Sequence, residues 1–104
     1  MAAKRKTVSR KDLELSTFDA AEYLDSDETV AEYLALAARD SDPGRFIEAL
    51  GTVARAKGIS AIAEKAGVSR ESLYKSISPG ATPRYETVRK LLDALGVRFD
   101  VVAQ

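Results

Sequence analysis

The stretch Ile62–Ser78, IAEKAGVSRESLYKSIS, constrains this chain most, because a glycine separates two short helical patterns there. Gly67 suits a tight turn, since glycine readily adopts the left-handed conformation. Ser69 follows as an N-cap, whose hydroxyl can satisfy a free amide of the second helix. The pattern therefore predicts two helices, near residues 60–66 and 69–77, that meet at a steep angle as a helix-turn-helix. The residues that would join them are Ile62, Ala63, Ala66, Val68, Leu73 and Ile77.

Further helices are predicted on both sides of this pair by apolar residues at helical spacing. Their expected bounds are residues 18–24, 27–39, 43–57 and 83–95. Asp27, Asp42 and Thr82 are the expected N-caps, and Gly58 and Gly96 should end the last two helices. The sequence VRFDVV near the end alternates like a strand. We therefore expect a mainly α fold, a helix-turn-helix (lambda-repressor-like) helical domain with a short C-terminal β-strand. The side chains expected inside are Val30, Tyr33, Leu34, Ala37, Phe46, Ile47, Leu50, Val53, Ala54, Tyr85, Val88, Leu91, Leu92 and Leu95.

The formal net charge is zero, but the charge is divided unevenly along the chain. Residues 1–16 hold five basic residues and two acids, and we expect them to form a flexible basic tail. Residues 17–50 hold two basic residues and nine acids, which gives −7, whereas residues 51–104 hold nine basic residues and five acids, which gives +4. We expect residues 17–104 to form a single domain, of which the first part repels DNA and the second part attracts it.

The second helix of the central pair would present a polar face suited to the major groove of DNA. Arg70 is the best candidate for a bidentate contact with guanine, and Glu71 can accept from the amine of cytosine. The loop SPGATPR that follows is suited to holding a phosphate, and a plain connector is the alternative. A helix-turn-helix corner that never touches DNA is the alternative for the pair itself. The candidate DNA-binding residues are Ser69, Arg70, Glu71, Ser72, Tyr74, Lys75, Thr82 and Arg84.

The composition argues against several other functions. The chain has no cysteine and no histidine, so zinc sites of the Cys/His type and thiol or imidazole nucleophiles are excluded. The acid-rich segment that starts at Asp25 lacks the glycine and the closing glutamate of a calcium loop. We expect no enzyme, no cofactor and no metal. Because the chain lacks an apolar run of membrane-spanning length and a secretory signal, we expect a cytoplasmic protein with no membrane partner.

Two long segments resemble a known family: FDAAEYLDSDETVAEYLALAARDSDPGRFIEALGTVARAKG and AGVSRESLYKSISPGATPRYETVRKLLDALGV. They are similar to the HigA-type antitoxins, also called probable addiction module antidote proteins. The shared features are the acidic lead EYLDSDE, the helix end LGTVARAKG and the recognition helix SRESLYKSIS. The resemblance implies a dimeric antitoxin of a type II toxin–antitoxin pair, which neutralises a RelE/ParE-like toxin and binds operator DNA to repress its own operon. The loop SISPGATPRYE departs from the family, because it lacks the acid or amide often found there.

The acidic first half fits the implied partner, because toxins of that group are small basic proteins. Charge would speed the encounter, whereas affinity would rest on exposed apolar anchors. The candidate toxin-binding residues are Phe18, Tyr23, Leu24 and Tyr33, some of which are expected to lie in the core instead. We expect a chain that begins near Asp42 to keep the helix-turn-helix and to lose toxin neutralisation. The alternative functions are a stand-alone phage-type repressor without a toxin partner and, more remotely, an RNA-processing enzyme.

The tail VRFDVVAQ is expected to form a dimerising strand over residues 97–103, with Val97, Phe99 and Val101 on one side. A lone strand leaves amides and carbonyls unpaired, so it needs a partner strand. We expect that partner to be a second copy across a two-fold axis, which makes the protein a homodimer with two recognition helices on one face of the DNA. Addition of the strand to the sheet of the toxin is the alternative.

Overall fold

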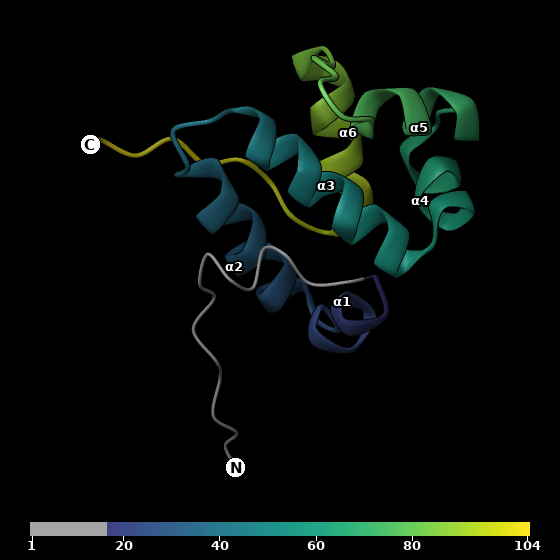
Figure 1. Ribbon diagram of the computed structural model, residues 1–104, viewed down its shortest axis with the longest axis horizontal. Coiled ribbons are helices and arrows are strands. Elements are labelled where there is room, and N and C mark those ends of the chain that lie inside the picture. The colour runs from purple at the N-terminus through teal and green to yellow at the C-terminus, as the bar shows by residue number, and fades with distance from the viewer. Residues whose placement is uncertain (1–16) are drawn as a thin grey trace.

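The computed structural model describes residues 17–104, and the predictions for residues 1–16 lie outside this part of the chain. The described residues form six helices and no strand, so the predicted mainly α fold is confirmed (Figure 1). The helices are α1 (Thr17–Tyr23), α2 (Asp27–Ala38), α3 (Gly44–Lys57), α4 (Ile59–Ala66), α5 (Arg70–Ile77) and α6 (Tyr85–Leu95). None of these described helices is long and apolar enough to cross a membrane.

Helix α3 lies at the centre of the fold. Helices α1 and α2 pack on it from one side, whereas α4 and α5 contact it from another and α6 packs against α4 (Figure 1). The predicted interior is largely confirmed, because α2 buries the stripe from Val30 to Ala37 and α6 buries the stripe from Val88 to Leu95. Tyr85 is an exception: its side chain is 63% exposed, since it lies one turn ahead of the buried stripe of α6.

The predicted N-caps of α2, α3 and α6 are all wrong. Ser26, not Asp27, caps α2: its Oγ accepts a hydrogen bond from the Thr29 amide at 3.2 Å, and Thr29 Oγ1 accepts from the Ser26 amide at 3.3 Å. This reciprocal pair is a capping box, and it places Asp27 inside the first turn. Thr82 does not cap α6, because Arg84 is extended (φ −67°, ψ 151°) and the helix therefore begins only at Tyr85.

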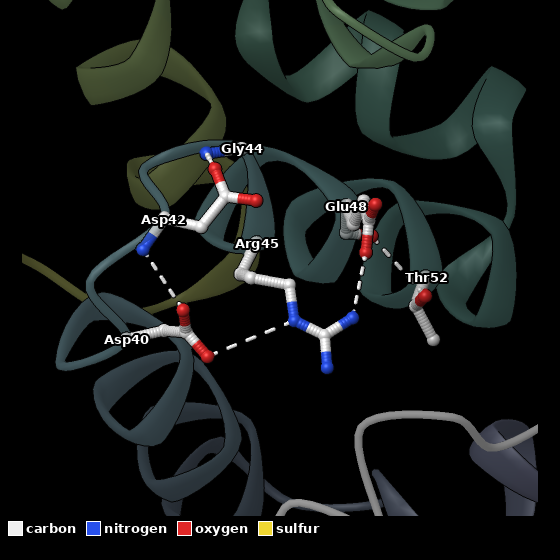
Figure 2. A network of polar contacts seen from close by, with 6 residues as sticks. All are labelled: Asp40, Asp42, Gly44, Arg45, Glu48 and Thr52. Atoms are coloured by element: carbon white, nitrogen blue, oxygen red, sulfur yellow. Dashed lines mark hydrogen bonds and ion pairs between the residues drawn. The ribbon is translucent and has the colours of Figure 1, made fainter.

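The corner between α2 and α3 is held by a network of polar contacts (Figure 2). Asp42 is not the N-cap of α3, because that position is taken by Pro43 and the helix begins at Gly44. Asp42 Oδ1 accepts from the Gly44 amide at 2.9 Å, one residue ahead of the cap. Asp40 accepts from the Asp42 amide at 2.9 Å and also pairs with Arg45, whose Nε lies 3.7 Å from Asp40 Oδ2. Arg45 Nη1 reaches Glu48 Oε1 at 3.2 Å, so this arginine lies between two carboxylates.

The C-terminal tail, residues 97–104, is not a strand in the single chain. It turns at Gly96 (φ +84°), and the ring of Phe99 stacks on Phe46 of α3 at 5.4 Å and on Tyr85 of α6 at 6.2 Å. The three residues expected on one side of a strand therefore differ in environment: Val97 packs against the core, Phe99 is 42% exposed and Val101 is 94% exposed. Strand pairing would need a second chain, which an isolated copy does not provide.

Candidate nucleic-acid interface

Gly67 adopts the left-handed conformation that was predicted for the turn between α4 and α5. Gly67 has φ +74°, and its amide donates to Glu64 O while the Val68 amide donates to Ala63 O at 3.0 Å. These bonds satisfy the last carbonyls of α4 and turn the chain sharply. Ser69 Oγ then accepts from the Ser72 amide at 3.0 Å, which confirms the predicted N-cap of α5. The hydroxyl of Ser69 is therefore already engaged in holding the start of α5.

Helix α5 is fixed by a narrow apolar face and exposes the rest of its surface. Leu73 is 0% exposed and Ile77 is 3% exposed, so these two side chains join the helix to the core. Tyr74 is 44% exposed, although aromatic side chains are usually buried. The residues that were predicted to face outward are all exposed: Arg70, Glu71, Ser72, Tyr74 and Lys75.

A groove of about 650 Å³ follows α5, at the loop that was predicted to hold a phosphate. The Ala81 amide donates to Ser78 O at 3.0 Å and Gly80 has φ +79°, which is typical of a type II turn. This turn brings the loop back beside α5. The lining of the groove includes Lys75, Ser76, Ser78, Pro79, Gly80, Ala81, Thr82, Pro83, Arg84 and Thr87.

The groove also contains three polar side chains that were not among the predicted site residues, namely Ser76, Ser78 and Thr87. The Ser76 hydroxyl donates to Ser72 O at 2.9 Å and the Ser78 hydroxyl donates to Lys75 O at 3.0 Å, so both protons are used within the chain. Thr87 lies in the groove because the Pro79–Gly80 turn reverses the chain. The Pro-Gly dipeptide, which is typical of a turn, is the feature of the sequence that could have predicted this position.

The candidate interface is locally basic. Arg70, Lys75 and Arg84 are exposed on α5 and at the end of the loop, and Glu71 is the only carboxylate on α5. Within residues 17–104 no ion pair involves these three cations, whereas Lys90 and Glu86 on α6 approach each other at 3.9 Å. The arrangement therefore offers three accessible positive charges beside a hydroxyl-lined groove, which is suited to a polyanion.

The residues predicted to anchor a toxin are mostly not on the surface. Leu24 is 2% exposed and Tyr33 is 0% exposed, so neither is an exposed anchor and both belong to the core, where Tyr33 was also predicted to lie. Their helical spacing places them in the core, where α1 and α2 pack on α3. Tyr23 is half-buried and packs against the same core, and the side chain of Phe18 lies outside the described part of the chain.

The exposed surface of α1, α2 and the link between them is acidic instead. Its carboxylates, here called the acidic surface, are Glu22, Asp25, Asp27, Glu28 and Glu32. Arg45, one of the two basic residues between positions 17 and 50, is held by Asp40 and Glu48 at the α2–α3 corner (Figure 2). It therefore does not neutralise this surface. Helices α1 and α2 lie across α3 from α5, so the acidic and basic surfaces are separate (Figure 1).

Comparison with known proteins gives two matches. Residues 14–103 match the family described as "Probable addiction module antidote protein". An uncharacterised protein of Haemophilus influenzae is 41% identical over 88 residues, which are 85% of this chain and 91% of that protein. No solved structure matches the chain. The family match covers both the acidic helices and the α4–α5 unit.

Proposed function

Because the chain belongs to the family of probable addiction module antidote proteins, we propose that it is the antitoxin of a type II toxin–antitoxin pair, as the HigA-type antitoxins are. In this proposal it neutralises a small basic RelE/ParE-like toxin and binds operator DNA as a dimer to repress its own operon. It acts in the cytoplasm by binding alone, without catalysis.

The DNA-binding part of the proposal is carried by the exposed face of α5. Helices α4 and α5, with their tight turn, would act as a lambda-repressor-like helix-turn-helix, and α5 would enter the major groove. Arg70, at the first position of α5, would meet base edges, since the N-terminal residues of a recognition helix come closest to them. Lys75, Thr82 and Arg84, which line the groove after α5, would hold a phosphate of the backbone.

The toxin-binding part is supported by the acidic surface. A basic toxin would be steered to α1 and α2, because opposite charges raise the rate of encounter. The buried positions of Leu24 and Tyr33 mean that neither is available as an apolar anchor. We therefore assign the encounter to the exposed carboxylates of the acidic surface.

The experiment that tests this function uses the full chain with two ligands. One is a duplex that carries the promoter of its own operon, compared with a scrambled duplex of the same length. The other is the product of the neighbouring reading frame, which we expect to be a small basic protein. Antitoxin function requires tight binding to that product and rescue of cells that express it. A chain that prefers its promoter duplex but neither binds nor neutralises the neighbouring product is a stand-alone repressor.

A further inference from the structure

Tyr74 is an exposed aromatic residue of α5 that no other ring of the described chain covers. Three aromatic side chains are exposed in that part of the chain: Tyr74, Tyr85 and Phe99. Tyr85 and Phe99 stack on each other, and Phe99 also stacks on Phe46. Tyr74, by contrast, has no ring contact and no hydrogen bond within residues 17–104. Tyrosine is enriched at binding interfaces, because it offers apolar area together with a polar tip. We therefore expect the partner of Tyr74 on the ligand of α5.

The exposed surface of α5 has two sides, and Tyr74 lies on the side of Arg70. Tyr74 follows Arg70 by four residues, so the two side chains are neighbours on one face of the helix. Among the described residues the groove after α5 is lined by Lys75 and Ser76, but Tyr74 is not part of its lining. The side of α5 assigned to the phosphate backbone is therefore distinct from the side assigned to base edges, and Tyr74 belongs to the latter.

We propose that the ring of Tyr74 contacts the C5 methyl group of a thymine, so that Tyr74 selects thymine at one base pair of each operator half-site. In the major groove the edges of guanine, cytosine and adenine present hydrogen-bonding groups, and thymine alone also presents a methyl group. Contact between the ring and this methyl group removes apolar surface of both from water, which is favourable. The inference rests on the proposed function and deepens it, because it names a base that the same site reads.

The spacing of Arg70 and Tyr74 also limits where this thymine lies. Four residues of an α-helix span about 6 Å, and the successive nucleotides of one DNA strand lie about 3.4 Å apart along the duplex. The guanine that Arg70 would contact and the thymine that Tyr74 would contact are therefore expected about two base pairs apart. The hydroxyl of Tyr74 has a different possible partner, a phosphate oxygen, and this contact would carry no preference for thymine.

The test replaces thymine by uracil, which removes only the methyl group and keeps the base pair. Footprinting of the full chain on the promoter duplex of its own operon locates the half-sites, and each thymine within them is then replaced in turn. Fluorescence anisotropy measures the affinity for each duplex. For the wild type, one such replacement near a guanine should weaken binding about fourfold per half-site, the value expected for the loss of one buried methyl group. Tyr74→Ala should bind the thymine and uracil duplexes equally, whereas Tyr74→Phe, which keeps the ring, should retain the preference for thymine.

The matched control is Tyr85→Ala, which removes another exposed tyrosine, outside α5, and should keep the preference for thymine. The measurement on the wild type needs no variant, so it stands even if Tyr74→Ala loses its helical circular dichroism. If the wild type prefers its promoter duplex but no uracil replacement weakens binding, the inference is wrong and the proposed function stands. A thymine preference that survives in Tyr74→Ala, or is lost in Tyr74→Phe, also overturns the inference. If the wild type binds promoter and scrambled duplexes equally, DNA recognition itself fails, and the inference fails with it.

Discussion

Arg70 and Lys75 are both exposed on α5, but their chemistry predicts different effects on DNA binding. The guanidinium can make two parallel bonds to guanine, whereas the ammonium is a point charge suited to phosphate. Arg70→Ala should cost about 1 to 3 kcal/mol on the operator and relax the preference at one base pair per half-site. Lys75→Ala should weaken operator and scrambled DNA alike. Fluorescence anisotropy on both duplexes measures the two effects.

Arg39→Ala is the matched control for Arg70→Ala. Arg39 is also exposed, but it follows α2 on the acidic side of the molecule. Its replacement should leave the ratio of operator to scrambled affinity unchanged. If Arg70→Ala also leaves that ratio unchanged, Arg70 has no part in recognising the sequence.

Ser69 contributes to stability through one hydrogen bond, from the Ser72 amide to its Oγ at 3.0 Å. Ser69→Ala leaves that amide without its cap and should lower the free energy of unfolding by about 1 kcal/mol. Ser76→Ala is the control, because the Ser76 hydroxyl donates only to a carbonyl within the same helix. Urea denaturation of both variants checks the prediction. Equal urea midpoints for the two variants would mean that water replaces the Ser69 hydroxyl as partner of the Ser72 amide without loss of stability.

At the level of helices, local signals predicted most of what the structure contains. The 3.6-residue spacing and the glycines at positions 58, 67 and 96 correctly gave the helices and their ends, because these signals act within one turn of the chain. The N-cap of α2 was missed because Ser26 and Asp27 are adjacent and both can cap. The sequence alone also cannot tell which face of a helix finds a neighbour. For that reason Leu24 was considered as an exposed anchor, Tyr33 as either an anchor or a core residue, and Tyr85 as a core residue.

The acidic helices are part of the core, so removing them is not a clean test of toxin binding. Leu24, Val30 and Tyr33 are buried where α1 and α2 pack on α3. A chain that begins near Asp42 would expose the matching face of α3. We therefore revise the expectation and predict that this truncation loses cooperative unfolding together with toxin binding.

Charge reversal on the acidic surface tests the same function without disturbing the core. Glu22→Lys/Glu28→Lys should lower the association rate constant with a basic toxin about tenfold at low salt, because electrostatic steering acts on encounter. The dissociation rate should change less. The control is Glu64→Lys/Glu71→Lys, which makes the same change at exposed positions of α4 and α5. Stopped-flow mixing measures both pairs. Equal association rate constants for the two double variants would exclude the acidic surface as the site where the toxin first meets the chain.

For the whole molecule, a net charge of zero does not imply weak dependence on salt. Operator binding would depend on the local cations at α5 and its loop, Arg70, Lys75 and Arg84. Because Arg70 is assigned to base edges, Lys75 and Arg84 are the cations that would each neutralise one phosphate. For the two copies of a dimer, the logarithm of the binding constant should therefore fall with the logarithm of salt concentration with a slope of about −4. Titration between low and physiological salt measures this slope. A flat dependence would contradict DNA binding by these residues.

The central position of α3 has a consequence for genetics. Helix α3, whose buried residues include Leu50 and Val53, contacts the acidic helices on one side and the α4–α5 unit on the other (Figure 1). In a random mutagenesis screen, alleles that fail only in repression should map to α5 and its loop, and alleles that fail only in protection from the toxin should map to α1 and α2. Alleles that lose both repression and protection from the toxin should map to α3, the helix on which both groups of helices pack.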